Sequence, residues 1–496
     1  MKKRFLVNFI LLLSVNVLVK PAWLFADLLV QRVTQEAYGQ YFVLFNLSMM
    51  LNMLLDFGIS NYNNRKVAGN VNKFQNYFAN VVSLRIVLTF LYLIVLTAVG
   101  CLLSYQGKEL KWLLLLGANQ VLLAGITYLR SNLTALSHFS MDRIVSVLDR
   151  IVMSSILLFV LFYSAIQINI LLFIKIQFIG YLCAFIMALL FVVVKGGAIF
   201  PSWNWKFKKT LLIQSFPYAL IVLLMSAYSF LDSVMLDVLL PNGVWENMIY
   251  AQSFRILMAG NNYAYLIAVL LLPIFSKLIQ EKKDVVPLLQ LSGSLLIYAV
   301  MVFSIIASIF SAELISMLYG QSMEDQTYLE RFESPLVSVR NGSEVMYSAK
   351  VFAVLILGLI AMSFNYVYGV LLTAGGQMKT LNRIALVGLV GNIVLNWILI
   401  PSQGAFGAAI ASISTQGLAA VGQWYFCYKK HAISFRKLHF LKFIGIAVTV
   451  IAVSYYSHLY FETVNGITIS ALTGFLLLFT LKIVSLDSIK TRLLNR

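Results

Sequence analysis

The sequence predicts an all-α membrane protein with about 14 transmembrane helices, arranged as two pseudo-symmetric six-helix lobes followed by two C-terminal helices. The first observation is composition, because 60% of the residues are hydrophobic and only 11% are charged. That balance excludes an ordinary soluble fold of 496 residues. The second is a series of apolar runs, each close to the roughly 20 residues that a spanning helix needs. The third is the placement of the basic residues between these runs.

The apolar runs follow one another along almost the whole chain and are separated by short connections. To within several residues they cover 5–30, 37–60, 77–104, 111–137, 144–166, 168–194, 210–240, 247–276, 285–311, 347–374, 380–401, 404–428, 438–459 and 464–484. The first run follows Lys2, Lys3 and Arg4, as in a signal peptide, but it is too long and Lys20-Pro21 interrupts it. These features favour a first helix that is retained.

Basic residues alternate between the connections. Both termini and every second connection carry 25 Lys and Arg, whereas the intervening connections carry six. Basic loops remain on the cytoplasmic side of a membrane. The pattern therefore predicts a multi-pass protein of the bacterial inner membrane with both termini in the cytoplasm. The net charge of +18 follows from these short loop clusters and does not indicate nucleic-acid binding.

The connection 195–209 combines Gly and Pro with tryptophans and lysines, a mixture typical of a segment at the membrane interface. A weak repeat also relates Asp27 and Tyr41 to Asp237 and Tyr250. Internal duplication is common in transporters, whose sites lie between the repeats. We therefore expect a first lobe at 1–195, a cytoplasmic interfacial linker at 196–209, a second lobe at 210–430 with an outside loop at 312–346, and two further helices with a cytoplasmic tail at 431–496.

Six basic residues lie inside the apolar runs. They are Lys20, Arg85, Arg130, Arg150, Lys175 and Arg255. Each costs about 2.5–3.5 kcal/mol at the centre of a spanning helix, so all six facing lipid would be very unfavourable. We expect them to line a water-filled cationic cavity that binds an anionic ligand, since arginine holds phosphate through two parallel hydrogen bonds. The alternative is that some of these basic side chains extend along their helices, so that their charged ends reach the interface between membrane and water.

Acidic residues inside the runs are candidates for ion pairing and for coupling to an ion gradient. Asp27, Asp232 and Asp237 are the candidates for coupling, and Asp149 is a further pairing candidate. The sequence predicts no cofactor and no metal site, because the three cysteines and four histidines lack metal-ligand spacing. It also lacks a nucleotide-binding phosphate loop, and we expect no enzymatic activity.

Three groups of motifs carry a family resemblance. They are Glu36–Phe45 with Asp56–Ser60 and Asn64–Ala68, Phe230–Leu236 with Tyr250–Ile256, and Leu395–Pro401 with Gly404–Ala411. In this order they resemble the polysaccharide and O-antigen flippases of the multidrug/oligosaccharidyl-lipid/polysaccharide exporter superfamily. The resemblance implies a MATE-like fold and the transfer of undecaprenyl-diphosphate-linked oligosaccharide units to the outer leaflet by alternating access. Many members have twelve spans, which leaves the role of the last two helices open.

The resemblance also implies partners and leaves alternatives. The expected partners are the undecaprenyl-diphosphate-linked glycan of O-antigen, capsule or exopolysaccharide, membrane lipids, H⁺ or Na⁺, and a downstream polymerase or ligase. A lipid II flippase and a cation-coupled drug or metabolite antiporter share the fold, and a membrane glycan polymerase or ligase is a further alternative. Asp56 and Arg65 are candidates for a cytoplasmic gate or a simple helix end, with Gly58 allowing the chain to turn.

Overall fold

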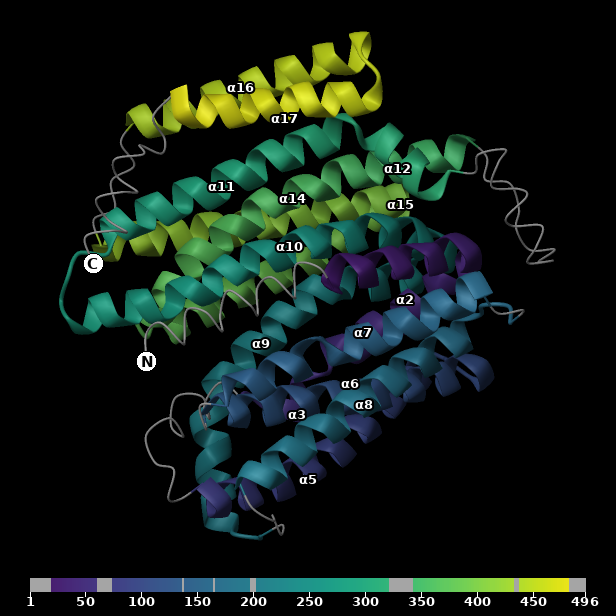
Figure 1. Cartoon of the computed structure of the whole chain (residues 1–496), viewed down its shortest axis with the longest axis vertical. Coiled ribbons are helices and arrows are strands. Elements are labelled where there is room, and N and C mark those ends of the chain that lie inside the picture. The colour runs from purple at the N-terminus through teal and green to yellow at the C-terminus, as the bar shows by residue number, and fades with distance from the viewer. Residues whose placement is uncertain are drawn as a thin grey trace. The chain divides into compact units, whose positions relative to one another are not determined.

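The computed structural model describes residues 19–59, 74–135, 138–163, 166–196, 202–320, 342–431 and 437–480. Every regular element within these ranges is a helix (Figure 1). Ten helices of the described chain are long and apolar enough to cross a membrane. The all-α membrane fold predicted from the sequence is therefore confirmed.

The first of two compact units contains the described residues up to Met248. Its helices are residues 19–34, α2 (Glu36–Met50), α3 (Met53–Asp56), α5 (Phe74–Leu102), α6 (Gly107–Ala135), α7 (Phe139–Tyr163), α8 (Ile170–Gly196), α9 (Trp205–Leu239) and the start of α10 (Gly243–Gln280). Helix α6 packs against α8, α2 and α5, while α7 packs against α8 (Figure 1). Buried side chains such as Phe78, Leu133 and Ala184 form the core between these helices.

The second compact unit contains the remaining described residues. It consists of the rest of α10, α11 (Val286–Ile309), α12 (Ser311–Tyr319), α14 (Gly342–Ala374), α15 (Met378–His431), α16 (Lys437–Tyr460) and α17 (Thr463–Thr480). Helix α14 packs against α11, α12 and α15, and the pair α16–α17 packs against α11. The predicted last two helices therefore form a hairpin whose core is shared with α11 through Tyr298, Phe310 and Val450.

Two predicted helix boundaries have clear backbone signatures. Helix α15 covers two predicted runs, and Gly404 separates them with φ 55° and ψ −135°, just after Pro401. Helix α3 ends where Phe57 and Gly58 have φ of 47° and 72°, so the expected turn at Gly58 is confirmed. A Cβ atom at Gly58 would also lie 2.7 Å from the backbone nitrogen of Ala219. Glycine is therefore required there for both conformation and space.

The described part of the predicted linker at 196–209 is hydrogen-bonded to α5. The Ser83 hydroxyl donates to the carbonyl oxygen of Ser202 at 2.6 Å, and the Asn204 amide donates to Oδ1 of Asn80 at 3.0 Å. Trp203 and Trp205 remain largely exposed, in keeping with aromatic side chains at headgroup depth. The interfacial position of this segment stays a prediction.

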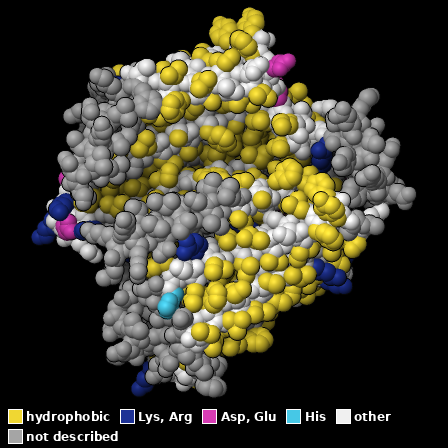
Figure 2. All heavy atoms as spheres, in the orientation of Figure 1, with side chains coloured by type: hydrophobic (Ala, Val, Ile, Leu, Met, Phe, Trp, Pro, Cys, Tyr) yellow, Lys and Arg dark blue, Asp and Glu magenta, His cyan; other side chains and the backbone are white. Residues whose placement is uncertain are grey.

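The sides of the helices carry large exposed apolar side chains, as a surface that contacts lipid tails requires. Phe90 and Ile94 of α5 and Trp397 and Ile398 of α15 are each more than 60% exposed. Figure 2 shows how widely hydrophobic side chains cover one face of the molecule, while Lys and Arg are sparse among its described residues.

Candidate functional site

Arg85 on α5 lies in a buried ion pair. Its Nη1 is 2.8 Å from Oδ1 of Asp56, and its Nη2 donates to the carbonyl oxygen of Ala124 at 3.0 Å. The guanidinium carbon also lies 4.6 Å from the ring centroid of Tyr128. Only 11% of the Arg85 side chain is exposed. These contacts join α3, α5 and α6 and neutralise the charge where it is buried.

Arg130, near the end of α6, pairs with an acid at the start of α7. Its Nε lies 2.7 Å from Oδ1 of Asp142, and its Nη2 donates to Oδ2 of Asp142 at 3.5 Å. The Arg130 side chain is 33% exposed, whereas that of Asp142 is 9% exposed. Sequence reasoning did not single out Asp142. The available signal was its place in the first turn of a predicted helix, where the helix dipole favours an acid.

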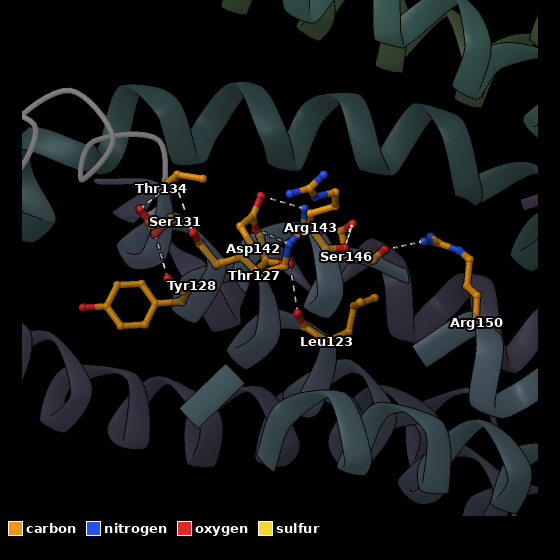
Figure 3. Close-up of polar contacts among 10 residues, drawn as sticks. Leu123, Thr127, Tyr128, Ser131, Thr134, Asp142, Arg143, Ser146 and Arg150 are labelled. Atoms are coloured by element: carbon orange, nitrogen blue, oxygen red, sulfur yellow. Dashed lines mark hydrogen bonds and ion pairs between the residues drawn. The ribbon is translucent and has the colours of Figure 1, made fainter. Parts of the chain in front are cut away.

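Arg150 is held differently from Arg85 and Arg130. Its Nη1 donates a long hydrogen bond of 3.4 Å to the carbonyl oxygen of Ser146, one turn back on α7 (Figure 3). Among the described residues no carboxylate lies within ion-pair distance of Arg150. The side chain is half-buried. Its guanidinium therefore keeps hydrogen-bonding capacity for a ligand.

Lys20 lies near Arg150 and Arg130. It is half-buried on the helix of residues 19–34, and it interacts electrostatically with Arg150, Arg130 and Asp149. Asp149 is buried, and its Oδ1 has no hydrogen-bond partner among the described residues. We call Lys20, Arg130 and Arg150 the basic cluster. With Asp142 and Asp149 ionised, these five groups leave one positive charge in excess.

Lys175 and Arg255 are the remaining predicted cationic residues. Lys175 is exposed on α8 and shares its face with the exposed residues Ile179, Cys183 and Ile186. That face has the character of a lipid-facing stripe, on which a lysine extends toward the interface. Arg255 belongs to the second compact unit, where it is half-buried on α10.

The three candidate coupling acids are buried to different extents. Asp27 accepts hydrogen bonds from the Tyr38 hydroxyl at 2.9 and 3.0 Å and from the Gln31 amide at 3.4 Å. Asp237 accepts a hydrogen bond of 2.6 Å from Tyr105, which lies in the turn between α5 and α6. Burial, with a smaller effect from Asp237, raises the pKa of Tyr105, so the phenol remains a donor at neutral pH. Asp232 is fully buried on α9.

Two tyrosines of α2 make polar contacts near the first half of the weak repeat. Tyr38 donates to Asp27, and Tyr41 accepts a hydrogen bond of 2.8 Å from Gln177. At the candidate cytoplasmic gate, Asp56 pairs with Arg85, while Arg65 lies outside the described residues.

In the part of the chain that the structure describes, no three His, Cys, Asp or Glu side chains are grouped to hold a metal ion.

The ten long apolar helices of the described chain define a multi-pass membrane protein. The family model described as "Polysaccharide biosynthesis protein" matches residues 5–279, more than half of the chain, so the chain belongs to this family. No curated protein sequence matches it significantly. The resemblance predicted from the sequence motifs is confirmed at the level of family.

Solved structures show the same fold. A structure of the lipid II flippase MurJ in an inward closed conformation has a TM-score of 0.73 and 14% identity, covering 98% of this chain and 100% of its own. An inward-facing MATE family multidrug transporter of the MOP superfamily has a TM-score of 0.62 and 13% identity, covering 86% and 98%. A MOP superfamily transporter from Pyrococcus furiosus has a TM-score of 0.55 and 14% identity, covering 86% and 94%. By name these three solved proteins are a flippase and two transporters, and their similarity to this chain is one of fold.

Proposed function

We propose that this protein moves undecaprenyl-diphosphate-linked oligosaccharide units of O-antigen, capsule or exopolysaccharide from the inner to the outer leaflet of the bacterial inner membrane. The observation that carries the proposal is the basic cluster, which brings together three cations from three helices. Among the residues that the structure describes, only Arg130 of these three has a direct carboxylate partner. Membership of the polysaccharide biosynthesis family supports the glycan part of the substrate.

The cluster offers the chemistry that a diphosphate headgroup needs. Arg150 can donate two parallel hydrogen bonds to phosphate oxygens, and Lys20 adds a mobile point charge. Arg130 can exchange its carboxylate for the ligand or remain paired with Asp142. Because the surrounding helices are apolar, charge attraction there is screened less than in water. Ligand phosphate in turn relieves the repulsion between Lys20 and Arg150.

Transport would proceed by alternating access between a lobe of residues 1–195 and a lobe of residues 210–430. The alternation of basic connections places both termini in the cytoplasm, so the charged end of α6 and the start of α7 would face the inner leaflet. The sequence contains no nucleotide phosphate loop, and H⁺ or Na⁺ is the proposed driving ion. Asp27, Asp232 and Asp237 remain the proposed coupling acids, and a downstream polymerase or ligase would consume the product.

A lipid II flippase is the second candidate. It is favoured by the MurJ structure, which covers a larger share of this chain than the MATE structures do. The two candidates predict different phenotypes on gene deletion. Loss of surface glycan with accumulation of its lipid-linked unit inside supports the first, whereas lysis with accumulation of lipid II supports the second.

The deciding experiment complements the deletion strain with variants of the cluster. We expect Arg150→Ala to leave the lipid-linked glycan on the inner leaflet and to reduce surface glycan by roughly tenfold, because a charge-assisted hydrogen bond contributes about 1.5–3 kcal/mol. Arg150→Lys should restore part of the export. Arg383→Ala, which removes an exposed arginine from α15, is the matched control. Normal export by Arg150→Ala and Lys20→Ala at normal expression would contradict the proposal.

A further inference from the structure

A separate cavity of about 740 Å³ lies at the other end of the first compact unit. Residues 33–35 and 37, residues 107, 108, 111 and 112, and residues 161 and 167–171 line it. These segments are the entry to α2, the start of α6, the end of α7 and the start of α8. Arg130 and Asp142 lie instead near the end of α6 and the start of α7, so the cavity and the basic cluster are distinct.

The lining of this cavity is positively charged. Lys108 and Lys111 both contribute, and the Lys108 ammonium lies 4.6 Å from the ring centroid of the buried Trp112. The acids of the same helix turns, Glu36 and Glu109, do not line the cavity. Helices α2, α6 and α8 all begin here, and their N-termini add positive potential to that of the lysines. A ligand held at this place is therefore an anion.

Thr34, Gln35, Gln167 and Asn169 also line the cavity, and the rest of its wall is apolar. This apolar part favours a lipid over a free anion. Val33, Leu161 and Ile168 line the cavity beside the lysines. The adjacent end of α7 exposes Phe162 and Tyr163, at 57% and 82%. Aromatic residues at a helix end are typical of headgroup depth. The volume also lies within the range of about 300–1,000 Å³ that small-molecule sites occupy.

We propose that this cavity binds the phosphate of a lipid headgroup, with Lys108 and Lys111 as its direct partners and the apolar wall against the glycerol or the first methylene groups. On the predicted topology it lies at the outer leaflet. The phosphate can come from an anionic phospholipid of the membrane or from the lipid diphosphate after transfer. Only the second source rests on the proposed function.

Native mass spectrometry of the full-length protein tests the site through binding alone. The probes are phosphatidylglycerol, phosphatidylcholine and undecaprenyl diphosphate, each added to the delipidated protein in detergent. We expect the wild type to retain phosphatidylglycerol over phosphatidylcholine, and the double variant Lys108→Gln/Lys111→Gln to lose roughly tenfold in that retention. Lys350→Gln, which removes an exposed lysine from α14, is the control. Ala37→Phe fills the cavity without changing a charge and provides a second, independent variant.

The pattern of losses identifies the source of the phosphate. Loss of phosphatidylglycerol alone assigns the site to a membrane phospholipid, loss of undecaprenyl diphosphate alone assigns it to the cargo, and loss of both indicates a shared phosphate site. Unchanged binding of both lipids to the double variant and to Ala37→Phe would overturn the proposal. Failure of the flippase function would appear instead as normal glycan export by Arg150→Ala, so the two outcomes are separate.

Discussion

Two arginines of the first compact unit differ in what surrounds their charge. Arg85 is almost fully buried and contacts Asp56, a carbonyl oxygen of α6 and the face of Tyr128. Arg150 is half-buried, and it donates a long hydrogen bond to a carbonyl oxygen of its own helix. Neutralisation by a protein carboxylate indicates a structural role, while a cation with spare donors is available to a ligand.

Arg130 lies between these two cases. It has a carboxylate partner in Asp142, but a third of its side chain is exposed. It is therefore placed both to join α6 to α7 and to face the charge of Lys20. We therefore expect the loss of stability on replacing the arginine to decrease in the order Arg85, Arg130, Arg150.

The largest effect on stability is expected for Arg85→Ala. Removing one partner of a buried pair leaves Asp56 charged without its guanidinium, and such changes cost about 3–5 kcal/mol. Thermal unfolding of the detergent-purified protein, followed together with expression level, measures the loss. The double variant Arg85→Met/Asp56→Leu should be less destabilised than Arg85→Ala, because it leaves no uncompensated charge. A wild-type melting temperature for Arg85→Ala would refute the structural role.

A smaller loss, about 1–2 kcal/mol, is expected for Arg130→Ala, because it leaves the buried Asp142 without its charge partner. The same thermal measurement detects it. Adding Asp142→Asn to Arg130→Ala should recover part of the stability, since the neutral amide is less costly to bury than the carboxylate. If the second substitution destabilises the protein further, Asp142 is stabilised by groups other than Arg130.

The smallest effect on stability is expected for Arg150→Ala and Lys20→Ala, each within about 0.5 kcal/mol of the wild type, because neither has a direct carboxylate partner among the described residues. Lys20→Ala also removes a repulsion from Arg150. A strong loss of stability in both variants would place them with Arg85 and remove the distinction on which the proposed site rests.

The sequence predicted those parts of the fold that depend on local signals. Apolar runs set the order of the helices, and Pro401 with Gly404 marked the break within α15. The conformation at Gly58 followed from its place after Asp56, since glycine adopts positive φ without strain. Such features depend only on residues that are close together in the sequence.

The partners of the charged residues depend on packing and were not predictable in the same way. Asp56 pairs with Arg85, 29 residues away on the next long helix, whereas Arg65, the other candidate gate residue, lies outside the described residues. From the sequence we expected all six intramembrane cations to line one cavity. The sequence does not show which face of α8 carries Lys175, and in the structure this lysine lies with exposed apolar residues. Only the positions of α6 and α7 relative to residues 19–34 bring Lys20 toward Arg130 and Arg150.

The most direct test of the basic cluster is translocation of an undecaprenyl-diphosphate-linked glycan in proteoliposomes, measured as the fraction of labelled lipid that a membrane-impermeant enzyme can reach. Wild-type protein and Arg383→Ala should transfer the lipid equally well. Arg150→Ala should transfer it roughly tenfold more slowly while retaining wild-type thermal stability, with Arg150→Lys in between. Equal transfer by Arg150→Ala and the wild type would contradict a role for this cluster in binding the cargo.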